Sequence, residues 1–329
     1  MKMKLAILGT GMIVRDALAA LEAVPEIERT AIWARPHSKE KAEALAKQYA
    51  IPQVYTDYAP LLQKAEADFI YIGLVNTAHY DYAKQALEAG RNVILEKPFT
   101  VRANEARELK ELAESKHLFL IEAVTTLHLP NFGVVRRLLP KIGRIRAVQA
   151  NFSQYSSRYN AYLAGDAMPS FDPACAGGAL YDLGSYNLNF IVCLFGMPRA
   201  AAYQPNRGFN GVDTSGVAVL CYDGFTAVAV QAKDSGSPSG ILMQGKKGWI
   251  RANGTPNQLE SVTFCVDGKM ETINENRYAH RMVHEFQAFA AAYAAGDYDF
   301  VRQGLTQSLS VVELLEELHD ENALLDLIE

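Results

Sequence analysis

Strand-like and helix-like segments alternate without a break through the first 121 residues of the chain. The opening apolar segment, 5–8, leads into a glycine-containing turn, and apolar residues then recur at helical spacing from Val14 onward. Such alternation is typical of a parallel sheet with helices on both faces. Further strands are expected at 30–34, 69–74, 92–95 and 118–121, and further helices at 39–49, 78–89 and 103–115.

Beyond residue 122 the pattern changes to consecutive strands joined by short turns such as Asp223-Gly224, which predicts a mostly antiparallel sheet. At 329 residues the chain also exceeds what one hydrophobic core usually organises. We therefore expect an α/β protein of two domains: a doubly wound Rossmann domain over 1–121, and an α/β domain with an open, mostly antiparallel sheet over 122–329. In the second domain, strands are expected at 146–152, 216–222, 225–232, 241–244, 248–252 and 261–266, and helices at 132–139, 180–194, 280–295 and 306–318.

Composition and charge exclude several classes of partner. The 32 basic residues are scattered among 37 acidic ones, for a net charge of -5, which argues against nucleic acid. No apolar run is long enough for a membrane span, and Gly9 ends the N-terminal run short of a signal peptide. Cys175, Cys193, Cys221 and Cys265 lack metal-site spacing and are expected to be small buried residues. We expect a cytoplasmic protein with no metal, membrane or nucleic-acid partner.

The turn after the first strand has the pattern of a dinucleotide-binding loop. Its glycines permit a tight turn and let backbone N–H groups approach a pyrophosphate at the start of the following helix. Val14 stands at the third glycine position of the pattern, which predicts slightly looser packing of strand and helix. A G-x-G pattern alone is equally typical of a structural turn. Its position after the first strand of a βαβ unit is what favours a dinucleotide-binding loop. The expected cofactor contacts here are Gly9, Thr10, Gly11, Met12 and Ile13.

The end of the second expected strand indicates which dinucleotide is bound. NAD-binding chains usually have an acidic residue there for the ribose 2′-hydroxyl, whereas this chain has Ala34 followed by Arg35. A guanidinium can bind a 2′-phosphate through paired hydrogen bonds. We expect NADP(H) to be preferred, with NAD(H) as the alternative. The other interpretation of Arg35 is an exposed loop residue.

Two further segments carry side chains suited to proton transfer. Lys97 follows the expected strand 92–95, where ligands of open α/β sheets bind. On the expected helix after a glycine pair, Asp182 and Tyr186 are one turn apart and share a face with Asn189. Each of these features alone is more typical of a protein surface than of a catalytic site.

Taken together, segments 9–13, 86–98 and 177–186 resemble the glucose-fructose oxidoreductase, inositol dehydrogenase and rhizopine-catabolism (Gfo/Idh/MocA) family. The alanine-leucine-glutamate-alanine-glycine run that leads to Glu96-Lys97-Pro98 is the most specific of the three. The likeness extends over nearly the whole chain. It implies a Rossmann domain, a second α/β domain with an open antiparallel sheet, and the reversible oxidation of an alcohol in a sugar, polyol or related diol.

The resemblance also implies roles for single residues. Lys97, Asp182 and Tyr186 match the family's catalytic positions, and a tyrosine at the last one is similar to the glucose-fructose oxidoreductase and dimeric dihydrodiol dehydrogenase branch. Segment 125–130 lacks the arginine that many relatives carry, which leaves a substrate contact of those relatives open for this chain. Matches to the cofactor-lining positions are Ala34, Arg35, Leu74, Asn76, His79, Glu96 and Lys97.

In this arrangement the Lys97 ammonium would favour ionisation of Tyr186, and Asp182 would hold the lysine or the substrate hydroxyl. Which of Lys97 and Tyr186 transfers the proton stays open. Two other functions are also open: a glycoside hydrolase that recycles a tightly bound NAD, and a non-catalytic dinucleotide sensor. In 217–222 and 226–230 both alternating sets of residues are apolar, which predicts a homodimer or higher oligomer through the second sheet.

Overall fold

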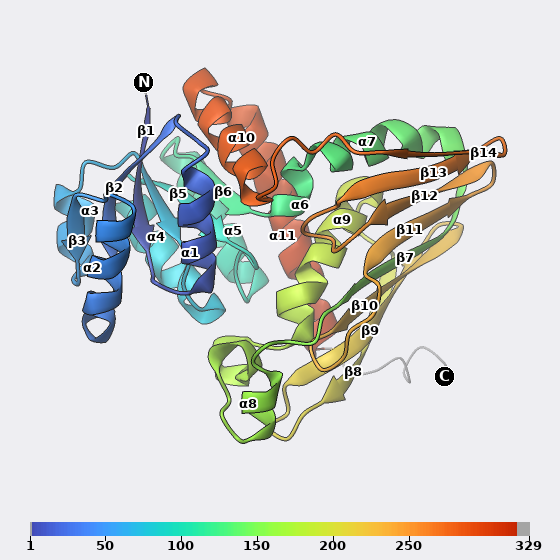
Figure 1. Cartoon of the computed structure of the whole chain (residues 1–329), viewed down its shortest axis with the longest axis horizontal. Coiled ribbons are helices and arrows are strands. Elements are labelled where there is room, and N and C mark those ends of the chain that lie inside the picture. The colour runs from blue at the N-terminus through green and yellow to red at the C-terminus, as the bar shows by residue number, and fades with distance from the viewer. Residues whose placement is uncertain (1, 321–329) are drawn as a thin grey trace. The chain divides into compact units, whose positions relative to one another are not determined.

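The computed structural model describes residues 2–320, which separate into two compact units (Figure 1). The first unit contains residues up to 123 together with 280–309, and the second contains 124–279 together with 310–320. Residues 280–309, which come late in the sequence, thus belong to the same unit as the first 123 residues. The domain boundary predicted at residue 121 stays a prediction. Within 2–320, no helix combines the length and apolar character that a membrane crossing needs.

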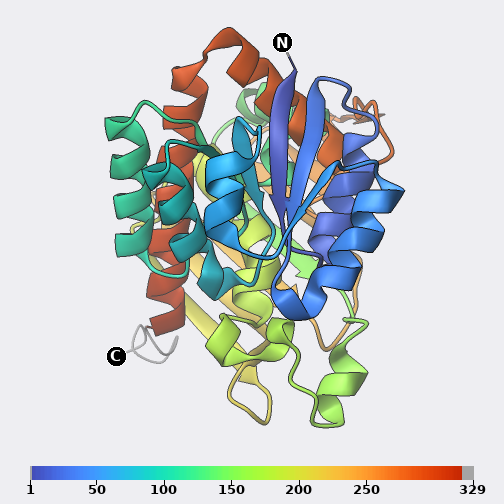
Figure 2. The ribbon, with the colours of Figure 1, turned by 90° about the vertical axis from the view of Figure 1, so that its left-hand side faces the viewer.

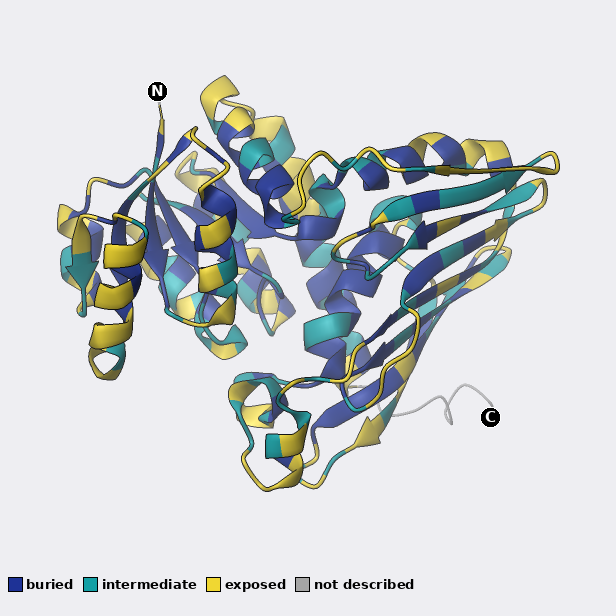
Figure 3. Cartoon of the chain, in the orientation of Figure 1, coloured by how far each residue is buried: buried dark blue, intermediate teal, exposed yellow. Residues whose placement is uncertain are grey.

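The first unit is built on a parallel six-stranded sheet with the order β3-β2-β1-β4-β5-β6, the doubly wound arrangement. Figure 2 shows α1 and α2 on one face of this sheet and α4 and α5 on the other. Its strands are mainly buried, while exposed residues gather on the outward sides of the helices (Figure 3). The elements are β1 (Met3–Leu8), α1 (Met12–Leu21), β2 (Ile27–Trp33), α2 (Lys39–Gln48), β3 (Gln53–Tyr55), α3 (Tyr58–Lys64), β4 (Phe69–Ile72), α4 (His79–Glu88), β5 (Asn92–Glu96), α5 (Ala103–Ser115) and β6 (Leu120–Ala123).

A late helix, α10 (Met282–Ala295), completes this unit. Its Phe286 ring lies 5.9 Å from the ring of Tyr71 on β4, and its Tyr293 ring lies 5.0 Å from that of Phe69 in an edge-to-face arrangement. These aromatic contacts bury the part of the sheet that the helices between its strands leave open. The next helix, α11 (Tyr298–Asp320), begins in the first unit and ends in the second.

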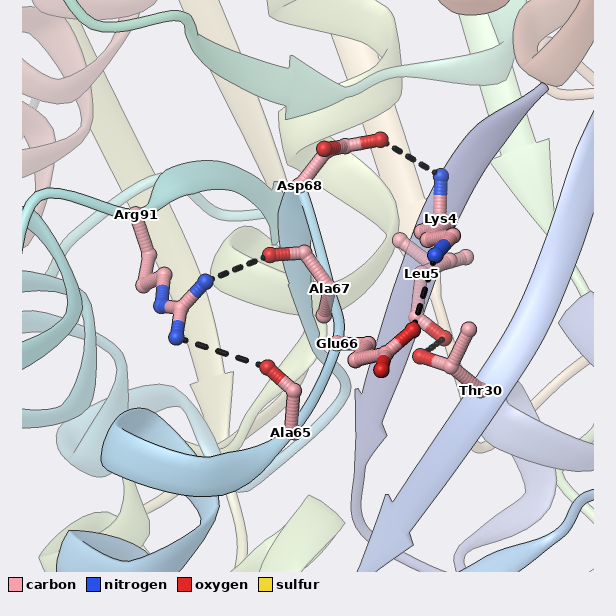
Figure 4. A network of polar contacts seen from close by, with 8 residues as sticks. All are labelled: Lys4, Leu5, Thr30, Ala65, Glu66, Ala67, Asp68 and Arg91. Carbon is pink, nitrogen blue, oxygen red and sulfur yellow. Dashed lines mark hydrogen bonds and ion pairs between the residues drawn. The ribbon is translucent and has the colours of Figure 1, made fainter. Parts of the chain in front are cut away.

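Polar contacts hold the amino ends of the parallel strands together (Figure 4). The Arg91 guanidinium donates to the carbonyl oxygens of Leu62 and Ala67 at 2.7 and 2.8 Å, and the backbone N–H of Lys4 donates to the Asp68 carboxylate at 2.9 Å. These bonds fix the loops that enter β4 and β5. The glycine turn and Lys97 lie at the opposite edge of the sheet, where strands β1 and β5 end.

The second unit is built on an eight-stranded sheet with the order β14-β13-β12-β11-β7-β10-β9-β8. Every neighbouring pair is antiparallel except β7 and β10, which are parallel. The predicted α/β class and mostly antiparallel second sheet are confirmed. The strands are β7 (Ile145–Ser153), β8 (Ala200–Arg207), β9 (Asp213–Tyr222), β10 (Phe225–Ala232), β11 (Gly240–Gly245), β12 (Gly248–Asn253), β13 (Ser261–Val266) and β14 (Lys269–Ile273). The helices are α6 (Thr125–His128), α7 (Pro130–Leu138), α8 (Tyr159–Leu163), a π-helical segment (Leu180–Gly184) and α9 (Ser185–Phe195).

The two faces of this sheet differ in burial. The residues that face the helices are buried, whereas on the other face apolar side chains stay partly exposed. Val219 lies opposite Val228, and Val217, which is 36% exposed, lies opposite Val230. Among the described residues of the second unit, one face of the sheet is therefore only partly covered, although both alternating sets are apolar.

Several local expectations were wrong. The strands β3, β8 and β14 and the helices α3, α6 and α8 were not predicted, and α11 begins eight residues before the predicted start of its helix. The predicted helix 180–194 is a π-helical segment followed by an α-helix. The four cysteines are half-exposed rather than buried, and none forms a disulfide.

Candidate active site

The glycine turn after β1 is closely packed on its inner side. Gly9 has a φ of +112°, and a Cβ there would lie 2.6 Å from the carbonyl oxygen of Gly73. Val14, at the third glycine position, is fully buried, and its Cγ2 atom would lie 2.7 Å from a Cβ on Gly73. The looser packing of strand and helix that Val14 predicted is therefore absent. Gly73 has no side chain, and this leaves room for the side chain of Val14.

The outer side of the same turn is open. Gly11 is the N-cap of α1, and within 2–320 no atom from beyond its immediate chain neighbours lies within 4 Å of the position that its Cβ would take. No side chain caps the helix, and its first turn contains no acidic residue. The first N–H groups of a helix have no partner within the helix and attract anions. The segment 9–13 therefore fits a dinucleotide pyrophosphate in both space and charge.

The end of β2 also suits a phosphorylated ribose. Ala34 is buried, whereas Arg35 is exposed at the start of the turn that leads to α2. Beneath them Trp33 packs against the rings of Tyr58 and Tyr82, with centroids 6.0 and 5.2 Å away. Segment 34–38 contains no carboxylate that would repel a 2′-phosphate.

The loop after β4 brings the expected cofactor residues Leu74, Asn76 and His79 to this edge of the sheet. Leu74 and Asn76 are half-buried. His79 is fully buried, with Nδ1 2.9 Å from the carbonyl oxygen of Pro98 and Nε2 3.3 Å from that of Leu74. Burial lowers the pKa of His79 to about 4, so its ring is neutral near pH 7. His79 thereby joins this loop to the peptide that follows Lys97.

Lys97 is half-buried and comes directly after β5, and its bond to Pro98 is cis. Its backbone N–H faces the buried Glu96 carboxylate at 3.3 Å, and Glu96 also accepts a 2.7 Å hydrogen bond from the Tyr71 hydroxyl. Burial raises the pKa of Glu96 above its usual range. In this structure Glu96 supports the segment that carries Lys97, and its contact with a cofactor stays a prediction.

A second buried carboxyl group near Lys97 was not anticipated. Glu122, at the end of β6, is bonded to the Ser308 side chain and to the backbone of Phe99. Its pKa is raised to about 7, mainly by burial and to a smaller degree by Glu96, while Lys97 opposes the shift. The notable sequence signal was a glutamate at the end of an otherwise apolar strand.

In the second unit, Asp213 anchors the start of the segment that bears the other candidate residues. Its carboxylate accepts 2.7 Å hydrogen bonds from the backbone N–H of Leu180 and from the Tyr203 hydroxyl. Gly178 has a φ of +117°, and a Cβ there would overlap the Asp213 carboxylate. The glycine pair is therefore needed for this carboxylate to reach the beginning of the helix.

Asp182 lies in the π-helical segment, and Tyr186 and Asn189 follow in α9. Single π-helical turns occur frequently at functional sites. The Asp182 side chain is 38% exposed, whereas Tyr186 is 5% exposed with its ring 5.8 Å from that of Phe152. Asn189 donates to the carbonyl oxygen of Ser185, one turn earlier in the same helical segment, at 3.0 Å.

The cation that faces Asp182 was not predicted from the sequence. Lys233 Nζ lies 2.9 Å from Asp182 Oδ2, although its side chain is only 3% exposed. Lys233 directly follows β10, so the signal that selected Lys97, a lysine after an apolar strand, was also present here.

The structure thus gathers the expected residues in two groups. The first unit brings together the glycine turn, the loop 74–79 and Lys97 at one edge of its sheet, while the second unit holds Asp182 and Tyr186 on one helical segment. Their assembly into a single site stays a prediction.

Comparison with known proteins identifies the family. Residues 3–123 match the oxidoreductase family with an NAD-binding Rossmann fold (GFO_IDH_MocA), and residues 136–251 match the GFO/IDH/MocA C-terminal domain. The chain is 30% identical over 315 residues to the NADP(+)-dependent scyllo-inositol 2-dehydrogenase IolU of Bacillus subtilis (strain 168), with 95% of each chain covered. It is 28% identical to the trans-1,2-dihydrobenzene-1,2-diol dehydrogenase of Xenopus tropicalis, over 82% of this chain and 80% of that one.

Solved structures show the same fold. The 3-ketoreductase KijD10 of Actinomadura kijaniata, in complex with NADP and TDP-benzene, superimposes with a TM-score of 0.86 at 24% identity, over 97% of this chain and 98% of that one. A levoglucosan dehydrogenase in complex with NADH and levoglucosan gives a TM-score of 0.85 at 15% identity, with 97% of each chain covered. The motifs, the two sheets and these relatives lead to one conclusion: the chain belongs to the Gfo/Idh/MocA family and is a nicotinamide-dependent oxidoreductase of CH–OH groups.

Proposed function

We propose that this protein interconverts an alcohol and a carbonyl group of a sugar, polyol or related diol, with NADP(H) as the preferred cofactor. Lys97, Asp182 and Tyr186 are the proposed catalytic residues. The proposal is supported by the named relatives, which act on an inositol and on a dihydrodiol.

One observation carries the proposal. The start of α1, which has no side-chain cap and is open on its outer side, lies at the carboxyl edge of the first sheet. Lys97 lies at the same edge, and the carbonyl oxygen of the next residue, Pro98, is bonded to His79. A non-catalytic sensor would need the first of these features but not an amine supported by buried groups beside it.

The bound nicotinamide supplies or accepts the hydride, and the protein provides orientation and one proton transfer. The backbone of 9–13 would hold the pyrophosphate, and the loop 74–79 would line the nicotinamide half of the cofactor. Tyr186 and Lys97 would share the proton of the substrate hydroxyl, because a nearby ammonium stabilises a tyrosinate. Asp182 would orient that hydroxyl or the lysine.

The preference for NADP(H) is supported by the end of β2. Arg35 is exposed where the 2′-phosphate would lie. Segment 34–38 has no acidic side chain that could accept a hydrogen bond from the 2′-hydroxyl of NAD(H). The Bacillus subtilis relative is named as an NADP(+) enzyme.

We further propose that two copies of the chain associate through the second sheet. Val217, Val219, Val228, Val230 and Leu242 leave apolar surface partly exposed on one face of it. A second copy would remove that surface from water.

The direct test is a spectrophotometric screen of sugars, polyols and dihydrodiols, in both directions and with both cofactors. We expect turnover with at least one of these substrates, faster with NADP(H), and its loss in Lys97→Met. Cofactor binding without turnover by any of them would overturn the proposal and favour a dinucleotide sensor.

A further inference from the structure

Lys233 is a buried cation with three partners. Its Nζ donates to the carbonyl oxygen of Ser170 at 2.6 Å and to Asp182 Oδ2 at 2.9 Å, and it lies 4.4 Å from the centroid of the Phe171 ring. An ammonium group that is removed from water needs such partners, since an unpaired buried charge is strongly unfavourable. The contacts with Ser170 and Phe171 therefore help to keep the cation in place beside Asp182.

The main chain around Lys233 is also fixed. Its backbone N–H donates to the carbonyl oxygen of Thr214 at 2.8 Å. The next residue, Asp234, accepts 2.7 Å hydrogen bonds from the hydroxyl groups of Thr214 and Ser215. Lys233 is thus held at both ends, by β9 through its backbone and by the segment 170–171 through its ammonium group.

Asp182 differs from its partner in exposure. Its side chain is 38% exposed, compared with 3% for Lys233. In a pair of two exposed residues both side chains are mobile and the interaction is weak. Here the cation is buried and the anion reaches toward solvent, so the buried partner sets the position of the exposed one.

We propose that Lys233 is a positioning residue for the reaction, which holds the Asp182 carboxylate in one orientation. The inference rests on the proposed function, because it takes Asp182 as a residue that meets the substrate or Lys97. Lys233 itself is too deeply buried to be a substrate contact. It acts on turnover only through the Asp182 carboxylate.

A purely structural role for Lys233 makes a different prediction. If the ammonium group only ties the segment 170–171 to β10, its removal lowers stability and affects turnover independently of Asp182. A positioning role makes the two residues energetically coupled, which a double-mutant cycle measures.

The experiment compares Lys233→Met, Asp182→Asn and the double variant in the full-length protein, with the best substrate from the screen. We expect Lys233→Met to lower kcat by about tenfold to a hundredfold, the scale of a misplaced catalytic group, with little change in KM or in NADPH affinity. In the Asp182→Asn background the same change should lower kcat by less than about twofold. Lys233→Arg, which keeps the charge, should recover part of the loss.

Controls separate the ways in which this can fail. Arg137→Met breaks an exposed ion pair of the same unit, with Glu275, and should leave kcat unchanged. If Lys233→Met does not fold, Lys233→Gln replaces it in the cycle, because glutamine keeps a hydrogen-bond donor without the charge. The double variant with Asp182→Asn removes both charges of the pair, so neither is left without its partner. Melting temperatures identify losses that are due to unfolding.

Strict multiplication of the two single effects on kcat would overturn the positioning role, as would full turnover in a folded Lys233→Met variant. Inactivity of the wild-type protein on every substrate would instead count against the proposed function. Full turnover in Asp182→Asn would reject the role of Asp182 and, with it, that of Lys233.

Discussion

The Nδ1 atom of His79 lies 2.9 Å from the carbonyl oxygen of Pro98 and joins the loop after β4 to the peptide that follows Lys97. The imidazole is fully buried, and the low pKa of His79 keeps it neutral, so one ring N–H can donate without a buried charge. The residue that follows the candidate catalytic lysine is therefore held by the first residue of α4.

We predict that His79→Leu lowers kcat by about tenfold to a hundredfold, because the Lys97 segment loses a fixed support. The unpaired buried carbonyl should also destabilise the fold by about 1 to 3 kcal/mol. His79→Asn, whose amide can still donate, should recover part of both. Unchanged turnover in a folded His79→Leu variant would show that the support is not needed for catalysis.

Tyr186→Phe keeps the ring packed near Phe152 and deletes the hydroxyl. It should lower turnover by roughly a hundredfold to ten-thousandfold, the usual effect of a positioned acid–base group, with cofactor binding retained. If Lys97 acts through Tyr186, the double variant with Lys97→Met should lose less than the product of the single losses. Steady-state kinetics of the three variants would check this. Near wild-type turnover in Tyr186→Phe would leave Lys97 as the acid–base candidate.

Arg35→Ala should weaken the binding of NADPH but not of NADH, because only NADPH has the 2′-phosphate. The loss of a charge-assisted contact of about 1.5 to 3 kcal/mol corresponds to roughly a tenfold to hundredfold change in affinity. Titration of both cofactors would measure it. Lys47→Ala, which removes an exposed positive charge from α2, is the matched control. Equal weakening of both cofactors would mean that Arg35 only stacks on the adenine.

Glu122 makes a pH-dependent contribution to stability. Its pKa is raised from 4.5 to about 7 in the folded chain, so the unfolded chain releases its proton first as the pH rises. Stability should therefore fall between about pH 4.5 and pH 7, by up to about 3 kcal/mol. Glu122→Gln should remove that decrease in urea unfolding at pH 5 to 8, while the exposed Glu111→Gln should not. An unchanged pH profile in Glu122→Gln would refute this.

Light scattering at micromolar concentration should show a dimer or a larger assembly. Val228→Glu places a charge in the middle of the half-exposed apolar face and should shift the protein toward a monomer. A charge at Lys269→Glu, on the exposed strand β14, is the control. A monomeric wild-type protein would contradict the proposed association.

The sequence predicted the fold class because apolar periodicity is a local property that each segment carries by itself. It did not reveal β8, since the alanine-rich segment with Pro205 has little strand propensity and becomes a strand by pairing with β9. The candidate site residues were predicted from their places at strand ends and from the family motifs.

What the sequence could not provide were contacts between distant positions. Lys233 obeys the same strand-end rule as Lys97, but its meaning depends on Ser170, 63 positions away, and on Asp182. Similarly, His79 was expected to line the cofactor, and nothing local indicates that its ring bonds the carbonyl oxygen of Pro98.

The late arrival of α10 matters for how the protein is made. Met282 follows Ala123, the last residue of β6, by 159 positions, and a ribosome that adds roughly 5 to 20 residues per second needs about 8 to 30 seconds for that stretch. During this time the rings of Phe69 and Tyr71 have not yet met Tyr293 and Phe286. The part of the chain that is synthesised first is therefore among the last to be finished, and the nascent sheet must be kept from aggregation until the end of translation.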